Sequence, residues 1–257
     1  MRPIKRYHFS ELPSTNDKAK ELSRSYAANE YLAVSADVQT SGRGRNGKVW
    51  LGKPHENLYC SLAVRHAEAT TKTSADLAAF QARGSLSALQ AIRSLLPPPV
   101  RSSVLLKYPN DVYMPNAAQE RKKVCGVLVE HEFIGFRCSG SVIGIGINVR
   151  QLHFPAELTP KASSLLACGI DASVEEVQEA LLRECEQYLE APSAVVFEEW
   201  WRELRLAGVN VTLSGSEGIW TTVRLNEDGS LVVRRADDGT EQRTVSNGDS
   251  LVRLDWQ

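Results

Sequence analysis

Hydrophobic and polar positions follow two different periods along the first two hundred residues. Short apolar or alternating runs predict β-strands, and apolar residues repeated at three- and four-residue spacing predict helices. Strands are expected at residues 4–9, 32–38, 57–65, 104–107, 122–133 and 136–149, the last two joined by a tight turn at Ile134-Gly135. Helices are expected from a Ser14-Thr15-Asn16-Asp17 cap to about residue 27, at residues 74–96, near Leu165, and at residues 174–189 and 194–206.

The pattern changes at Gly208. Short alternating segments follow, separated by turn sequences at residues 214–218, 226–229, 237–239 and 247–249. Such spacing is typical of a small five-stranded β-barrel. We therefore predict an α+β protein with two domains: a mixed sheet with helices over residues 1–207, and a small β-barrel over residues 208–257.

Composition narrows the class of protein. The chain has 257 residues, 42% of them hydrophobic, and a formal net charge of −1. It contains no apolar run of the ~18 to 20 residues that a membrane span needs, and its N-terminus has no apolar signal region. The five cysteines form no C-x-x-C pair, and the five histidines have no metal-ligand spacing. We expect a cytoplasmic protein with reduced cysteines and no metal held by protein ligands.

The segment most unusual in composition is residues 42–48, which holds three glycines and three cations. Glycines let the backbone approach a ligand closely, and arginine binds phosphate or carboxylate with two parallel hydrogen bonds. The segment therefore predicts an anion-binding loop; the alternative is a flexible, solvated basic loop. It matches G-x-x-x-x-G-K, but Val49 stands where a phosphate-binding P-loop needs serine or threonine.

Three further segments carry candidate chemistry. Residues 107–111, Lys-Tyr-Pro-Asn-Asp, place a cation, an amide and a carboxylate at a strand end, although they also fit an ordinary surface turn. Lys123 and Gly126 lie in an apolar strand, where the lysine has the alternative of protecting a strand edge. The glycines of residues 144–148 suggest a ligand packed on the backbone, but they lack the third glycine and the helix of a Rossmann site.

Taken in order, these segments resemble the biotin–protein ligase family. The family carries S-T-N, Q-x-x-G-R-G-R-x-G-x-x-W, K-W-P-N-D, K-x-x-G-[IV]-L-x-E and G-x-G-x-N, and this chain has matching stretches at residues 14–16, 39–50, 107–111, 123–130 and 144–148. Tyr108 replaces the tryptophan of the third motif, and Lys48 stands where arginine is frequent. Because S-T-N begins at residue 14, we expect no N-terminal DNA-binding helix-turn-helix and no repressor role.

The resemblance implies a class II synthetase-like catalytic fold with an SH3-like C-terminal barrel. It also implies ATP-dependent activation of biotin as biotinyl-5'-AMP and transfer to a lysine of a biotin carboxyl carrier protein, with magnesium carried on ATP. The implied catalytic residues are Lys123, Arg45, Lys107 and Asp111. The implied biotin contacts are Ser14, Thr15, Asn16, Gln39, Arg43, Gly44, Arg45, Lys123, Gly126, Leu128, Gly144 and Gly146. The implied ATP or AMP contacts are Arg43, Arg45, Trp50, Asn110, Lys123 and Asn148. Gly126 and Gly144 are expected to leave room for the biotin ring.

Two other functions stay open at this point. A lipoate–protein ligase or octanoyltransferase has a related fold, and octanoyl transfer would need a reactive cysteine, for which Cys125 is the one candidate inside a motif. A nucleic-acid-binding module would use Arg43, Arg45 and Lys48 on phosphates, although residues 217–249 mix both signs of charge and predict no basic face. We expect a monomer or a homodimer, with residues 136–149 as a candidate edge strand for pairing across a two-fold axis.

Overall fold

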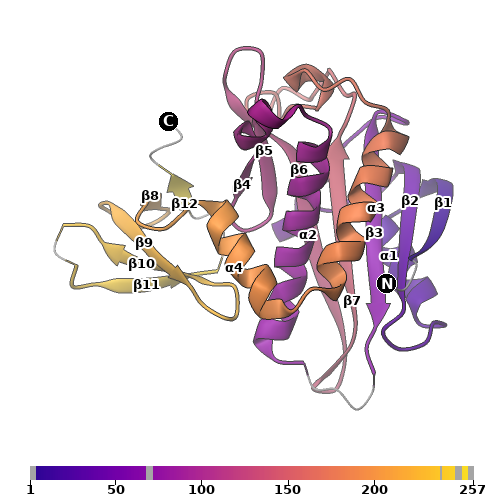
Figure 1. Ribbon diagram of the computed structural model, residues 1–257, viewed down its shortest axis with the longest axis horizontal. Helices are drawn as coiled ribbons and strands as arrows, with labels where there is room; N and C mark the ends of the chain where they lie inside the picture. Colours follow the sequence, from indigo (N-terminus) through magenta and orange to yellow (C-terminus); the bar gives the residue numbers. More distant parts are fainter. Residues whose placement is uncertain (1–3, 68–71, 238, 247–250, 254–257) are drawn as a thin grey trace.

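The computed structural model describes residues 4–67, 72–237, 239–246 and 251–253. Its larger sheet has seven strands in the order β1-β2-β3-β7-β6-β5-β4 (Figure 1). The β1–β2 pair is parallel and every other pair is antiparallel, so the predicted mixed sheet is confirmed. The strands are β1 (Lys5–Leu12), β2 (Tyr31–Gln39), β3 (Asn57–Arg65), β4 (Leu105–Lys107), β5 (Asp111–Pro115), β6 (Arg121–Ile134) and β7 (Arg137–Asn148).

Helices cover the two faces of this sheet unequally. On one face lie the long helices α2 (Ser74–Ser94) and α3 (Val174–Glu190), both begun by capping boxes (Figure 1). Gly84 of α2 lies so close to Ile143 and Val127 that an added Cβ would be 2.5 and 2.8 Å from their side chains. On the other face the short helix α1 (Thr15–Ser23) packs Ala19 into an apolar cluster with β2 and β7. The part of this second face that α1 leaves uncovered is where the site lies.

Helix α4 (Ser193–Leu204) leads to a second, five-stranded antiparallel sheet, called here the C-terminal sheet. Its strands are β8 (Asn210–Leu213), β9 (Trp220–Leu225), β10 (Leu231–Arg235), β11 (Gln242–Val245) and β12 (Leu251–Arg253), in the order β11-β10-β9-β8-β12. The five strands among the described residues after α4 agree with the predicted strand count. Closure into a barrel and a domain boundary at residue 208 stay predictions.

The structure corrects several expected elements. Strand β5 was not predicted, because it follows directly from the turn at residues 108–111 and ends in a proline. Helix α1 ends at Ser23 instead of residue 27, where serine hydroxyls donate to the carbonyls of Lys20 and Leu22. The helix expected near Leu165 is one 3-10 turn, η3 (Leu166–Cys168); two others are η1 (Arg45–Gly47) and η2 (Pro98–Ser103).

The strand at residues 136–149 was expected as an edge strand, and this was wrong. Strand β7 is paired on both sides, with β3 and with β6, and most of its residues are buried. The outer positions of the seven-stranded sheet belong to β1 and β4. None of the described helices has the length and the apolar content that crossing a bilayer requires.

Candidate active site

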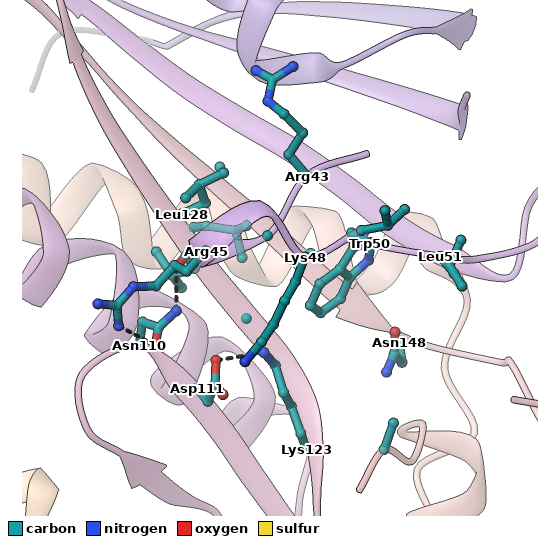
Figure 2. Close-up of a pocket in the computed structure, with 18 of the residues that line it drawn as sticks. Arg43, Arg45, Lys48, Trp50, Leu51, Asn110, Asp111, Lys123, Leu128 and Asn148 are labelled. Carbon is teal, nitrogen blue, oxygen red and sulfur yellow. Dashed lines mark hydrogen bonds and ion pairs between the residues drawn. The ribbon is translucent and has the colours of Figure 1, made fainter. Parts of the chain in front are cut away.

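One cavity of about 570 Å³ opens on the face of the sheet that α1 leaves uncovered (Figure 2). Its walls come from the start of α1, the glycine- and arginine-rich loop between β2 and β3, the β4–β5 turn, and the middle of β6 and β7. Every side chain or glycine predicted for the site lines this cavity. The volume falls within the range of small-molecule sites.

Neutral polar groups line the end of the cavity beside α1. Ser14 caps the helix and accepts from the backbone N–H of Asp17 at 3.4 Å. Thr15 donates from its backbone N–H and its hydroxyl to Gln39 Oε1, at 2.7 and 3.0 Å. The Asn16 amide donates to Glu130 Oε2 at 2.6 Å, and its oxygen accepts from Ser61 at 2.6 Å. The network fixes these side chains in one arrangement, which suits recognition of a neutral polar ligand group.

Cations gather at the other end of the cavity. Lys123 Nζ lies 2.7 Å from Asp111 Oδ1 and 5.2 Å from the centre of the Trp50 ring. Arg45 Nη1 donates to Asn110 Oδ1 at 3.2 Å, and the Asn110 amide donates to the Val127 carbonyl at 2.8 Å. Among the described residues the lining holds five cationic side chains against two carboxylates, Asp111 and Glu157. This excess of positive charge, in a chain of net charge −1, favours a multiply charged anion.

Arg43 takes a different direction from the one expected. Its guanidinium forms two hydrogen bonds with the Asp17 carboxylate, at 2.6 and 2.7 Å, and lies 3.7 Å from Glu130. These hydrogen bonds lower the pKa of Asp17 and raise the pKa of Arg43. Figure 2 shows Arg43 pointing away from Lys123 and Asp111. To contact an anion at the cationic end, Arg43 has to leave Asp17.

The space beside two of the strand glycines is occupied by protein side chains. A Cβ added at Gly144 would lie 2.2 Å from Asn16 Oδ1, and one at Gly126 would lie 2.8 Å from both Trp50 and Lys123. A Cβ at Gly146 would lie 2.6 Å from the Trp50 indole. The expectation that Gly126 and Gly144 leave open room for a ring is therefore corrected: the absent side chains let Asn16, Trp50 and Lys123 approach the sheet.

Comparison with known proteins decides the family. A model described as the biotin/lipoate A/B protein ligase family matches residues 9–148, more than half of the chain. This chain belongs to that family. It is 29% identical over 246 residues to the biotin--[acetyl-CoA-carboxylase] ligase of Mycobacterium tuberculosis, an alignment that covers 92% of this chain and 84% of that protein.

The matches to other ligases cover different shares of the matched proteins. The bifunctional ligase/repressor BirA of Bacillus subtilis is 34% identical over 161 residues, which is 62% of this chain and 45% of BirA. A solved biotin protein ligase from Aquifex aeolicus, in complex with biotin and ATP, superposes with a TM-score of 0.72 at 27% identity. That superposition covers 97% of this chain and 99% of the Aquifex chain, so the C-terminal sheet belongs to the shared fold.

A wall of the cavity that the sequence did not reveal lies between β7 and α3. Phe154, Glu157, Leu158 and Ala162 line the cavity, and the segment is tied to β6 by the Lys123 N–H, which donates to the Lys161 carbonyl at 2.9 Å. Asn148, predicted as a nucleotide contact, donates its amide to the Ser163 carbonyl at 3.0 Å. The segment has neither hydrophobic periodicity nor a motif, so only the fold brings it to the site.

Cys125 does not face the cavity. It points into the core, is fully buried, and its pKa is raised by burial. A thiol without access to a ligand, and with a raised pKa, is a poor nucleophile. Adjacent residues of a strand face opposite sides, which is why Gly126 lines the cavity and Cys125 does not.

Proposed function

We propose that this chain is an ATP-dependent biotin–protein ligase. It activates biotin as biotinyl-5'-AMP and transfers the biotinyl group to a lysine of a biotin carboxyl carrier protein or domain of a carboxylase. The observation that carries the proposal is one cavity with a neutral, hydrogen-bonding end beside α1 and a cationic end at Lys123 and Arg45. Biotin has a neutral urea-containing ring and a carboxylate, and ATP adds the larger negative charge. The similarity to biotin protein ligases supports the same substrates.

The first half-reaction brings two anions together. A carboxylate oxygen of biotin attacks the α-phosphorus of ATP, the bond from that phosphorus to the bridging oxygen breaks, and pyrophosphate leaves. Lys123 and Arg45, with Lys107 nearby, are placed to stabilise the charge that develops on the phosphoryl oxygens. Asp111 holds the Lys123 ammonium from one side, at 2.7 Å, so the lysine has a fixed position before the substrates arrive.

The nucleotide and the ring then take opposite ends of the cavity. Ser14, Thr15 and Gln39 are the proposed contacts of the biotin ring, with Gly44 and Leu128 on the walls. Trp50 is the proposed adenine cover, with Asn148, Phe154 and Leu158 as further lining residues of the nucleotide end. With two carboxylates in the described lining, one of them paired with Lys123, the residues fit magnesium that arrives on the phosphates, where it neutralises their charge.

In the second half-reaction the neutral amine of the acceptor lysine attacks the biotinyl carbonyl. The bond from that carbonyl carbon to the phosphate oxygen breaks, an amide bond forms, AMP leaves, and the proton lost by the amine passes to solvent. Asp111 is the carboxylate nearest to the cationic centre, and we propose that it orients the incoming amine electrostatically. A carboxylate is a weak base, so steering explains its place better than proton abstraction. The glycine- and arginine-rich loop would close over the adenylate and keep water from hydrolysing it.

Transfer through a cysteine, as octanoyl transfer would need, is disfavoured by the burial of Cys125. The test is incubation of the purified protein with ATP-magnesium and one acid at a time: biotin, lipoate or octanoate. Pyrophosphate release and a biotinyl-AMP peak with biotin alone support the proposal, as does later label on a carrier domain. Product with lipoate or octanoate and none with biotin would move the chain to the other branch of the family.

A further inference from the structure

A tyrosine hydroxyl joins the β4–β5 turn of the site to the C-terminal sheet. Tyr108 is buried, and its hydroxyl lies 2.9 Å from the carbonyl oxygen of Gly229 and 3.0 Å from that of Val245. Gly229 lies in the β9–β10 turn and Val245 ends β11. Burial raises the pKa of Tyr108, so the hydroxyl keeps its proton and shares it between the two carbonyls. The Tyr108 ring also stacks on Trp200 of α4, at 6.2 Å between centroids.

Two and three residues after Tyr108 come Asn110 and Asp111, which hold the cationic end together. Asn110 accepts from Arg45 and donates to the Val127 carbonyl, and Asp111 pairs with Lys123. Tyr108 itself donates away from the cavity, to carbonyls of Gly229 and Val245 in the C-terminal part of the chain. One short turn is thus fixed at one end by β6 and at the other by the β9–β10 turn and β11.

We infer that Tyr108 is a positioning residue, through whose hydroxyl the C-terminal sheet fixes Asn110 and Asp111 and thereby sets the rate of adenylate formation. The inference rests on the proposed function for its kinetic part. No residue of the C-terminal sheet lines the cavity among the described residues, so the sheet acts on the site through the turn. Stacking on Trp200 holds the ring, and the hydroxyl adds the two directed contacts to the β9–β10 turn and β11.

The same position explains a departure from the family motif. The motif carries tryptophan where this chain has Tyr108. An indole has its single N–H on the five-membered ring and has no donor at the far tip of the side chain, where the tyrosine hydroxyl meets Gly229 and Val245. In this chain the tie to the C-terminal sheet therefore depends on the tyrosine.

The test compares three single variants of the full chain. Tyr108→Phe removes the hydroxyl and keeps the ring. Gly229→Ala disturbs the acceptor side, because Gly229 has φ of 78° and an added Cβ would lie 3.3 Å from that of Ala78. Thr222→Val is the matched control: the Thr222 hydroxyl is buried and donates to the Leu206 carbonyl, so its loss loosens the C-terminal sheet without touching the turn.

We expect Tyr108→Phe to lower kcat for adenylate formation about tenfold while KM for biotin stays within about twofold, since Thr15 and Gln39 do not touch the turn. Gly229→Ala should act in the same direction. In the double variant kcat should fall by less than the product of the two single losses, because both substitutions act on the same Tyr108–Gly229 contact. Thr222→Val should lower the unfolding midpoint and leave kcat within about twofold.

A second readout does not depend on activity. Amide hydrogen exchange over residues 105–115 should rise in Tyr108→Phe and Gly229→Ala and stay at the wild-type level in Thr222→Val. A wild type that makes no adenylate would overturn the proposed function, and the exchange result would still decide whether Tyr108 holds the turn. Unchanged exchange and kcat in Tyr108→Phe, or equal losses in Tyr108→Phe and Thr222→Val, would overturn the inference.

Discussion

The two faces of strands β6 and β7 perform different tasks with neighbouring residues. Cys125 pairs in register with Ile147, and the next pair along the strands is Gly126 with Gly146. The first pair is fully buried in the main apolar core, on the face that α2 covers. The second pair lines the cavity and lies against Trp50. A shift of one residue along the same strand therefore separates the groups that stabilise the fold from those placed to bind a ligand.

This comparison shows why side-chain size changes so sharply within each strand. The core face needs volume, because apolar area removed from water contributes ~25 cal/mol per Å². The cavity face needs the opposite, since Asn16, Trp50 and Lys123 occupy the space that side chains at positions 126, 144 and 146 would take. Substitutions on the two faces should consequently separate stability from activity.

The strongest loss of stability should follow from a substitution on the core face. Ile147→Ala should lower the free energy of unfolding by about 3 kcal/mol, because it removes a fully buried side chain and leaves a cavity. Adenylate formation per folded molecule should stay within about threefold. Urea unfolding followed by a rate measurement checks both, and a small stability loss with a large rate loss would contradict the separation of the faces.

The next prediction concerns the pH dependence of stability and a buried histidine, His66, at the far end of the same core face. Burial lowers the pKa of His66 to about 4, and its Nε2 lies 2.8 Å from the Ser141 hydroxyl. The unfolded chain takes up this proton near pH 6.5, whereas the folded chain does not until about pH 4. Because one unit of pKa difference is worth about 1.4 kcal/mol, stability should fall by about 2 to 3 kcal/mol between pH 6.5 and pH 4.

Urea unfolding at several pH values measures this fall, and His66→Gln should flatten it. His131 contacts the same Ser141 hydroxyl at 2.8 Å, and burial lowers its pKa too, so some dependence should remain in the variant. If the free energy of unfolding rose as the pH was lowered through this range, His66 and His131 would not be buried in the neutral form.

A smaller effect is expected on the cavity face. Gly146→Ala places a Cβ 2.6 Å from the Trp50 indole, which then has to move. We expect adenylate formation to slow about tenfold, equivalent to ~1.4 kcal/mol, while the free energy of unfolding changes by less than about 1 kcal/mol. Urea unfolding and the rate of adenylate formation measure the two changes. A stable, fully active Gly146→Ala protein would show that Trp50 does not have to lie against the strand.

The smallest effect concerns the exposed pair that holds Arg43 away from the cationic end. Asp17→Asn should change the free energy of unfolding by less than about 1 kcal/mol, as is usual for an exposed ion pair. Freed from Asp17, Arg43 should reach an anionic ligand more easily, and KM for biotin should fall about twofold. Lys18→Gln, beside it on α1, is the control; a raised KM in Asp17→Asn alone would mean that the pair orders the loop for binding.

The sequence predicted the fold well wherever period and turn residues agreed. The bounds of β3 were predicted to the residue, and α2 and α3 to within two residues, because their apolar patterns and caps are clear. Strand β5 and the edge position of β4 were missed, since five residues beginning at a turn carry too little pattern. The family motifs placed the site, but the direction of Arg43 and the filling of the space at Gly144 depend on tertiary contacts with Asp17 and Asn16.

The role of the cationic end is best tested by measuring adenylate formation from biotin and ATP-magnesium by the wild type, Lys123→Ala and Arg45→Ala. Ile147→Val, a mild change on the core face, serves as the control. We expect biotinyl-AMP from the wild type and the control, a loss of about a hundredfold or more in Lys123→Ala, and a strong loss in Arg45→Ala. Equal rates in all four proteins would contradict the assignment of the cationic end, and no biotinyl-AMP from the wild type would contradict the proposed function.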